Sequence, residues 1–258
     1  MHIKELQKNW NEFARTDPLW AIITVPEKKG ARWNVEEFFQ TGRDEIAAVL
    51  RYVESLHVPL ARRKALDFGC GVGRLTQALA DHFDEVAGVD IAPSMLDLAR
   101  QYNRQGDKCK YFLNERADLR LFTDNQFDFI YTNVVLQHVE PRYTKQYLQE
   151  FVRILAPGGL LVFQLPSEVI RQGPPSLWRS LKDTVKLVLP RSLLNFYHEV
   201  RGTRRQADSE QPVMEMHGIP RKHVEKLLLK QGIKLLDVTP DQSPGPCWVS
   251  FRYCVTKE

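Results

Sequence analysis

The chain has 258 residues, of which 43% are hydrophobic and 26% are charged, so a wholly disordered protein is excluded and a sizeable core is expected. Lys and Arg number 36 against 32 Asp and Glu, and a net charge of +4 does not indicate a nucleic-acid partner. The four scattered cysteines form no CxxC pair, which argues against a structural metal and against a disulfide framework. Neither a membrane-spanning apolar stretch nor a secretory signal is recognisable, so we expect a cytoplasmic protein.

The first part of the chain predicts an N-terminal helical cap over residues 1–59. Within it, apolar residues of 35–56 recur at helical spacing. Strands and helices then alternate. The sequence predicts strands at 64–68, 85–90, 109–114, 127–133 and 160–166, with helices at 74–83, from 93, and at 141–155. Such a series predicts an α/β fold with a parallel sheet and helices on both faces.

Residues 167–219 interrupt this alternation and form an insertion within a domain that we place at 60–258. Residues 171–205 carry eight Lys or Arg and two acids, a local net charge of +6. Three interpretations stay open. The insertion is a helical lid with solvated charges, a peripheral contact with an anionic membrane surface such as the inner membrane face, or a docking site for an acidic partner.

The last third of the chain returns to regular structure. A helix is predicted at 220–231, and strands are predicted at 233–239 and 248–256. Only the short segment SPGP (243–246) clearly separates these strands, which favours an antiparallel hairpin over another crossover.

The segment ALDFGCGVGR (65–74) is the first candidate for a binding site. A strand carrying Asp67 enters three alternate glycines, Gly69, Gly71 and Gly73, and a helix follows. Glycine permits a sharp turn and a close approach of a ligand to the backbone, and the free N–H groups of the helix favour a carboxylate or phosphate. A simple tight turn is the structural alternative, which the strand–loop–helix context makes less favoured.

Two further acids follow the next strands. Asp90 ends the strand 85–90, where a carboxylate can accept both ribose hydroxyls of a nucleoside. Asp118 follows the third strand and could accept the exocyclic amine of adenine. A capping role for Asp90 and a solvated loop position for Asp118 are the alternatives.

Together these segments resemble the class I S-adenosylmethionine-dependent methyltransferases. The resemblance covers about residues 60–165, where LDFGCGVGRLT, VAGVDIAPSMLDLAR, ERADLRLF, FDFIYTNVVLQHVEP and ILAPGGLLVFQLP stand in the family's order. It implies a Rossmann-like sheet of seven strands in the order 3-2-1-4-5-7-6, with strand 7 antiparallel. Its implied cofactor is S-adenosylmethionine, with S-adenosylhomocysteine as product and no metal.

The resemblance also implies roles for individual residues. Asp67 would fix the aminopropyl end of the cofactor, the glycines with Cys70 would line its methionine part, and Asp90 would hold the ribose. The adenine would meet Ile91, Met95, Asp118 and Leu119, and Asn133 would lie between cofactor and acceptor. Arg43 would pair with the cofactor carboxylate, with a surface salt bridge as the alternative.

Candidate catalytic residues are few. A base is needed only if the acceptor must lose a proton, as a hydroxyl must. His138 follows the fourth strand and is a candidate base, a pocket wall or a structural residue. His217 could meet the site from the end of the insertion, or could be an ordinary loop residue. Tyr131 could orient an acceptor or be buried in the sheet.

We therefore expect a methyltransferase that acts on a small-molecule or lipid-linked acceptor, with oxygen favoured over nitrogen, as a monomer or homodimer. Two alternatives are retained. One is a binding protein that kept the cofactor site and lost the chemistry. The other is a nicotinamide-dependent oxidoreductase, which is disfavoured because Arg74 stands where the G-x-G-x-x-G motif places its third glycine.

Overall fold

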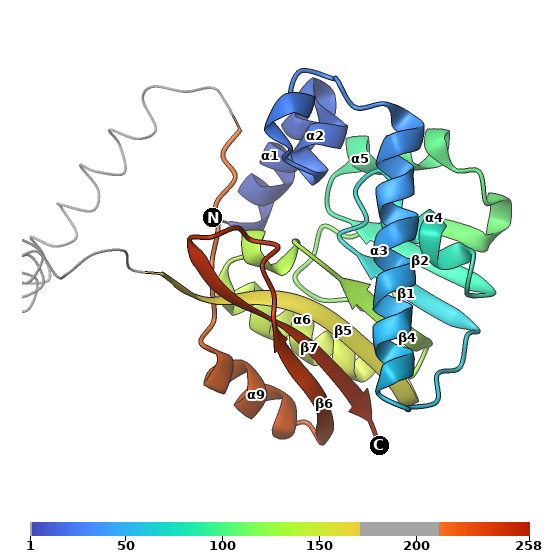
Figure 1. Cartoon of the computed structure of the whole chain (residues 1–258), viewed down its shortest axis with the longest axis vertical. Helices are drawn as coiled ribbons and strands as arrows, with labels where there is room; N and C mark the ends of the chain where they lie inside the picture. Colours follow the sequence, from blue (N-terminus) through green and yellow to red (C-terminus); the bar gives the residue numbers. More distant parts are fainter. Residues whose placement is uncertain (1, 171–211) are drawn as a thin grey trace, which may run out of the picture. The chain divides into compact units, whose positions relative to one another are not determined.

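The computed structural model describes residues 2–170 and 212–258. Its centre is a seven-stranded sheet in the order β3-β2-β1-β4-β5-β7-β6, which confirms the predicted order (Figure 1). The first five strands in sequence pair in parallel, and β7 runs antiparallel between β5 and β6. The strands are β1 (Lys64–Phe68), β2 (Glu85–Asp90), β3 (Cys109–Leu113), β4 (Phe127–Thr132), β5 (Leu155–Val169), β6 (Ile233–Pro240) and β7 (Trp248–Lys257).

The helices follow the predicted alternation closely. α4 (Arg74–Ala80) connects β1 to β2, α5 (Pro93–Tyr102) connects β2 to β3, and α6 (Pro141–Ile154) connects β4 to β5. α9 (Arg221–Leu229) precedes the β6–β7 hairpin. Each of α5 and α6 has proline near its start, where the missing N–H costs no hydrogen bond. The described residues also form three short 3₁₀ turns, η1 (Pro26–Lys28), η2 (Gly106–Lys108) and η3 (Leu136–His138).

Strand β5 is longer than its sequence predicts. The pattern Pro157-Gly158-Gly159 indicates a break between helix and strand, with the strand beginning at residue 160. In the structure, Leu155 already pairs with Phe127 of β4, and the register then shifts before Leu160 pairs with Phe129. Gly158 has a positive φ of 73°, so the glycines form an irregularity inside the strand.

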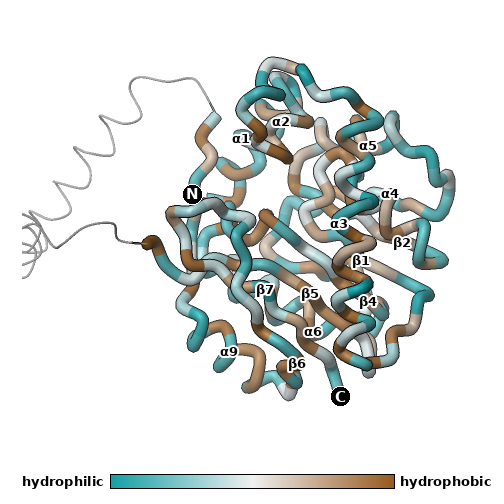
Figure 2. The backbone as a smooth tube through the Cα atoms, viewed as in Figure 1, coloured by the Kyte–Doolittle hydropathy of each residue, from teal (hydrophilic) through white to brown (hydrophobic). Residues whose placement is uncertain are grey.

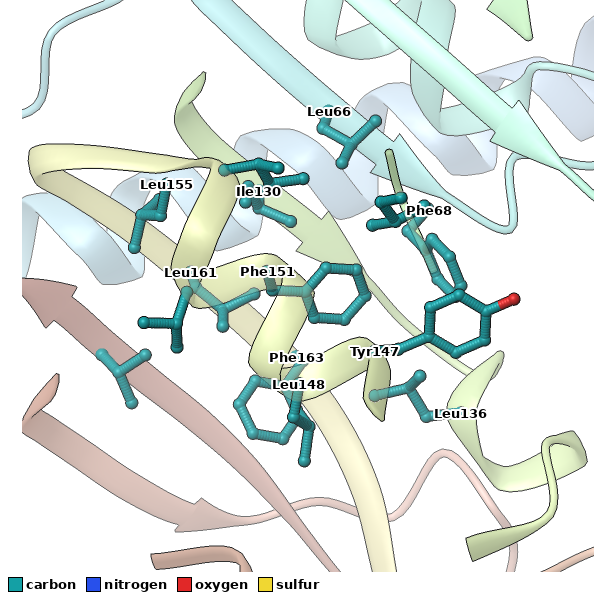
Figure 3. Packing of buried hydrophobic residues seen from close by; sticks show 14 of the residues in the cluster. Leu66, Phe68, Ile130, Leu136, Tyr147, Leu148, Phe151, Leu155, Leu161 and Phe163 are labelled. Atoms are coloured by element: carbon teal, nitrogen blue, oxygen red, sulfur yellow. The ribbon is translucent and has the colours of Figure 1, made fainter. Parts of the chain in front are cut away.

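One face of the sheet packs against α6 and α9. Figure 3 shows Tyr147 and Phe151 of α6 beside Phe68 of β1, and Leu148 of the same helix beside Phe163 of β5. The ring of Phe68 lies 4.7 Å from that of Tyr147 and 4.9 Å from that of Phe151. The apolar stretches coloured in Figure 2 gather on the central strands, as expected for strands covered on both faces.

The other face is covered by α3 (Val35–Ser55) and α4. Its buried residues alternate with those of the first face, so that Ala65 and Leu66 belong to different clusters. The N-terminal elements α1 (Ile3–Thr16) and α2 (Pro18–Ile22) form a third cluster with α3 and α5. Residues 1–169 and 214–258 thus make one compact unit.

The basic stretch 171–205 of the predicted insertion lies outside the described residues. The described flanks, 167–170 and 212–219, contain the end of β5 and no helix. Within the described ranges, no helix is both long and apolar enough to cross a membrane.

A glycine allows α3 to approach the start of α4. A Cβ atom on Gly42 would lie 2.6 Å from the carbonyl oxygen of Arg74 and 2.8 Å from its Cγ atom. Real Cβ atoms do not approach backbone oxygen so closely, so any larger residue here must displace one helix from the other. The contact places the Arg74 side chain beside α3.

We therefore expect Gly42→Ala to lower the free energy of unfolding by about 1–3 kcal/mol, although alanine is the better helix former. Ala48→Gly, on the exposed face of the same helix, is the matched control with a loss of about 1 kcal/mol from helix propensity alone. Urea unfolding of both variants measures this. A more stable Gly42→Ala variant would contradict the packing argument.

Candidate functional site

A cavity of about 630 Å³ lies at the carboxyl ends of β1, β2 and β4. This edge of an open parallel sheet is where such folds bind ligands, and the volume suits a small molecule. The cavity brings together most of the predicted cofactor residues, namely Asp67, Gly69, Cys70, Gly71, Asp90, Ile91, Met95 and Asn133.

The glycine loop forms one wall of the cavity. Gly71 has a φ of +51°, and a Cβ atom there would lie 2.7 Å from Cδ1 of Ile22. The N–H groups of Gly69 and Cys70 both donate to the carbonyl of Val89, which fixes the loop to β2. Gly73 also has a positive φ and begins α4, but it packs toward Tyr111 and does not line the cavity. The loop is thus a fixed backbone surface.

Asp90 is held by the backbone at the end of β2. Its Oδ2 accepts from Gly71 N–H at 2.8 Å, and its Oδ1 accepts from Ala92 N–H at 2.9 Å. Each carboxylate oxygen has a second lone pair, so two acceptor positions remain for a ligand. Burial raises the pKa of Asp90, and the backbone hydrogen bonds oppose this shift. The arrangement can accept two hydroxyl groups side by side.

Asp67 is almost wholly buried beneath the loop. Its Oδ2 accepts from the Thr76 hydroxyl at 2.6 Å. Burial raises its pKa to about 7, while Thr76 and the positive charge of Arg74 work in the opposite direction. The side chain is 1% exposed and still lines the cavity, so a cationic ligand there would favour its ionised form.

Glu45 of α3 is a carboxylate that the sequence did not single out. Its Oε1 accepts from the Tyr131 hydroxyl and from Nδ2 of Asn133, each at 2.9 Å. Its Oε2 accepts from Nη2 of Arg74 at 2.8 Å. Nη1 of Arg74 lies 3.3 Å from the Thr41 hydroxyl, one helical turn before Glu45. Glu45, Arg74, Thr41 and Asn133 all line the cavity, whereas Tyr131 lies behind Glu45.

The turn after β4 is strained, and hydrogen bonds involving residues of β5 and β7 hold it in place. Val134 has a φ of +59°, which a β-branched residue rarely adopts. Its N–H donates to Oε1 of Gln164 at 3.1 Å, and Nε2 of Gln164 donates to the Ser250 hydroxyl at 2.7 Å. Gln164 and Ser250 are both buried. Residues of β5 and β7 therefore fix the position of Asn133 and the backbone beside the cavity.

His138 lines the cavity, but both of its ring nitrogens are engaged. Nδ1 lies 2.8 Å from the Glu215 carbonyl, so this nitrogen carries the proton and donates. Nε2 lies 3.2 Å from Nε2 of Gln137 and accepts from that amide. Burial lowers the pKa of His138, which keeps the ring neutral, and its ring meets Trp10 at 5.5 Å. The geometry favours the pocket-wall alternative over the base.

The other catalytic candidates do not line the cavity. His217 has Nε2 3.4 Å from Oε2 of Glu215, and its N–H donates to the Gln137 carbonyl. Tyr131 is buried, and desolvation raises the pKa of its hydroxyl well above the ordinary value. Tyr131 therefore orients Glu45 rather than facing the cavity.

Three of the expected cofactor residues also lie elsewhere. Arg43 is on the outer side of α3, where it donates to Glu36 at 2.7 Å and to Gln40 at 2.8 Å. Asp118 faces Arg120, with 3.6 Å between Oδ2 and Nε, and Leu119 is buried in the core. None of the three lines the cavity.

Asn114 takes the cavity position next to that loop. It lines the cavity, and its Nδ2 donates to the carbonyls of Arg116 and Asp118. The adenine contacts of Asp118 and Leu119 stay a prediction. Residues 2–170 and 212–258 contain no cluster of three or more His, Cys, Asp or Glu side chains that could hold a metal ion.

The remainder of the cavity is mainly apolar. Trp10 of α1, Ile22 of α2 and several residues from the loops that follow line it, as do residues before α9 and in the β6–β7 loop. The chief members are Trp10, Ile22, Ile23, Val25, Trp33, Met214, Met216 and Pro244. The sequence analysis predicted the helical cap over residues 1–59 but assigned none of these residues to a ligand site.

Comparisons with known proteins find similarity to methyltransferases. Residues 66–163 match the family model described as "Methyltransferase domain". The ubiquinone biosynthesis O-methyltransferase of Bordetella avium is 25% identical over 190 residues, which is 72% of this chain and 76% of that protein. The trans-aconitate 2-methyltransferase of Methylobacterium radiotolerans is 34% identical over 144 residues, 54% of this chain and 51% of that protein. The chain thus spans about half the length of this second relative.

Solved structures show the same fold. Magnesium protoporphyrin IX methyltransferase from Synechocystis, crystallised with S-adenosylhomocysteine, superposes with a TM-score of 0.60 at 15% identity and covers 99% of both chains. An S-adenosylmethionine-dependent methyltransferase from Clostridium acetobutylicum has a TM-score of 0.58 at 16% identity, covering 96% of this chain and 98% of that one. The strand order and the family match over residues 66–163 together support a class I S-adenosylmethionine-dependent methyltransferase.

Proposed function

We propose that the cavity binds S-adenosylmethionine and that the protein transfers its methyl group to an oxygen of a small-molecule or lipid-linked acceptor. The observation that carries the proposal is the set of acids in the cavity wall. Glu45, Asp67 and Asp90 face a ligand site that contains Arg74 as its one charged basic residue among the described lining residues. Such an anionic cavity suits a cofactor that carries a sulfonium charge.

The residues present fit the cofactor part by part. Asp90 keeps two acceptor positions for the ribose hydroxyls, and the loop at Gly69 and Gly71 presents backbone without side chains. Ile91 and Met95 offer apolar contact for the adenine. When bound, the cofactor supplies an activated methyl group. The protein's own task is then to align the acceptor and exclude water.

The apolar wall supports an acceptor with a largely apolar body. Trp10 and Trp33 offer broad ring surfaces, and Met214 and Met216 are flexible side chains that adapt to varied shapes. The relative from Bordetella avium is named for O-methylation in ubiquinone biosynthesis, which favours oxygen as the acceptor atom. Peripheral membrane contact through residues 171–205, and the cytoplasmic location, stay predictions.

The first prediction concerns the ribose site. Asp90→Ala removes two charge-assisted acceptors, so we expect the affinity for S-adenosylhomocysteine to fall by about 2 kcal/mol or more, roughly thirtyfold. Isothermal titration calorimetry measures it. Asp97→Ala is the control, because Asp97 is exposed on α5 and pairs with Arg100. Unchanged affinity of Asp90→Ala would remove this residue from the site.

The second prediction concerns the pH dependence of stability. Asp67 has a pKa of about 7 in the folded protein against 3.8 in the unfolded chain. Between these values the folded state holds a proton that the unfolded state has lost, so the free energy of unfolding falls as pH rises from about 4 to about 7. The amide introduced by Asp67→Asn cannot ionise and escapes this penalty. Without cofactor, the variant should therefore melt at a higher temperature than the parent, and this difference in melting temperature should increase from pH 5 to pH 8.

Melting curves at pH 5, 6, 7 and 8 test this. The variant retains an oxygen for the Thr76 hydroxyl, so the difference between the two proteins reports the ionisation. A melting-temperature difference that does not change over this range would show that Asp67 titrates at its ordinary pKa.

The third prediction separates the pocket-wall and general-base interpretations of His138. As a pocket wall, its replacement by Asn should lower kcat less than tenfold and leave the pH profile of kcat unchanged, whereas loss of a general base typically costs 10²–10⁴-fold. Steady-state kinetics with a turned-over acceptor measures both. A hundredfold loss together with the disappearance of an acidic limb would assign His138 as the base instead.

A further inference from the structure

Gln137 carries an unpaired hydrogen-bond acceptor that the proposed reaction has not used. It lies in η3, the turn that follows β4, and it lines the cavity although the residue is only 3% exposed. Its Oε1 atom is buried and has no hydrogen-bond partner among the described residues. Of the other described lining residues, only Arg74 has a side-chain atom in this condition, and that atom is a donor. Gln137 Oε1 is therefore the unpaired buried acceptor of the described wall.

Two hydrogen bonds in series fix which way the Gln137 amide faces. The Glu215 carbonyl lies 2.8 Å from Nδ1 of His138, so this nitrogen must carry the ring proton. Nε2 of His138 then offers a lone pair, and the Gln137 amide can approach it at 3.2 Å only with its NH₂ group. The reversed amide would bring two lone pairs together. The oxygen of Gln137 is thus held on the side away from His138.

The surrounding chain supplies partners for every other polar part of this pair. The backbone N–H of His217 donates to the Gln137 carbonyl at 2.7 Å, and the ring of Trp10 packs against that of His138 at 5.5 Å. Among the described residues, none donates to Gln137 Oε1. Because an unpaired buried acceptor is unfavourable, a donor that enters the cavity gains affinity by pairing with it.

The neighbours of Gln137 indicate which kind of donor fits. Trp10 packs on His138, and Met214 and Met216 flank the residue whose carbonyl holds that ring. All three of these apolar side chains line the cavity. A charged donor such as an ammonium group would lose its hydration against such a wall, whereas a hydroxyl group is neutral and brings one donor.

We propose that Gln137 is a specificity-determining residue that accepts a hydrogen bond from a hydroxyl group of the methyl acceptor. The inference rests on the proposed function and narrows its acceptor to an apolar molecule that carries a hydroxyl donor. In it, His138 is a positioning residue, because it holds the NH₂ group of Gln137 and leaves Oε1 for the ligand.

Phenol and toluene are suitable probes, because they have nearly the same size and differ in one hydroxyl donor. Gln137→Met removes the acceptor with little change in side-chain volume. With S-adenosylhomocysteine bound, we expect the Kd of phenol to rise about threefold to tenfold in this variant, since one neutral hydrogen bond is lost. The Kd of toluene should change less than about twofold. NMR titration of the full chain measures both constants.

Gln149→Met is the matched control. Gln149 is exposed on α6 and does not line the cavity, so its variant should bind both probes as the parent does. His138→Phe tests the positioning role, and it stays available if Gln137→Met fails to fold. The phenyl ring can still pack against Trp10 but cannot fix the amide, so the preference for phenol over toluene should fall about threefold.

The outcomes separate this inference from the proposed function. Selective loss of phenol affinity in Gln137→Met, with an unchanged Gln149→Met control, supports the inference. Equal changes for the two probes would overturn it, as would a parent that binds S-adenosylhomocysteine but no phenol at millimolar concentration. An unchanged preference in His138→Phe would contradict the positioning role. A parent that does not bind S-adenosylhomocysteine in calorimetry would overturn the proposed function itself.

Discussion

Glu45 connects more parts of the site than any other described side chain. Its carboxylate receives hydrogen bonds from two residues in and after β4 and from one residue at the start of α4, while Glu45 itself lies on α3. This network fixes α3 against the carboxyl edge of the sheet. Its geometry depends on the backbone contact that Gly42 permits, because a larger residue there would move Arg74 away from α3.

The same site illustrates why binding and stability conflict. Asp67 is buried where its charge is penalised, and its pKa rises to about 7 as a result. A protein selected for stability alone would place an apolar residue beneath the glycine loop. Under the proposed function, the buried acid becomes favourable when a cationic ligand arrives, so the cost in the free protein is coupled to recognition of a sulfonium. Asp90 avoids part of the cost through two backbone donors.

Sequence reasoning succeeded for elements and motifs whose information is local. The strands at 64–68 and 85–90 were placed to the residue, because short apolar runs bounded by turns are distinctive. It was wrong about where β5 begins, because Pro157-Gly158-Gly159 looks like a terminator, whereas pairing of Leu155 with Phe127 extends the strand past it. The identification as a methyltransferase was confirmed by the family match over residues 66–163. It could be made from the sequence because several motifs occur in the family's order.

Side-chain direction was harder to predict. Arg43 and Glu45 are two residues apart, so on a helix of 3.6 residues per turn they project about 200° apart. Only one of them can face the cavity. The sequence analysis chose Arg43, because an arginine can pair with the cofactor carboxylate. The packing of Phe38, Gly42 and Ile46 against the rest of the molecule turns Glu45 inward instead. Asn114 rather than Asp118 reaches the cavity for a similar reason, since the loop folds back on its own carbonyls.

The amino-acid sequence by itself determined the alternation of strands and helices, the glycine loop and the acids at the ends of β1 and β2, since each depends on residues close together in the chain. The sheet order followed from the family resemblance that these motifs carry. Tertiary structure alone decided which charged groups meet in the cavity. Glu45, Arg74 and Asn133 come from separate elements, and their contacts depend on helix rotation and on close packing at Gly42. A repeating pattern in a single sequence does not reveal such contacts, because the rotation of each helix is set by packing across the whole core.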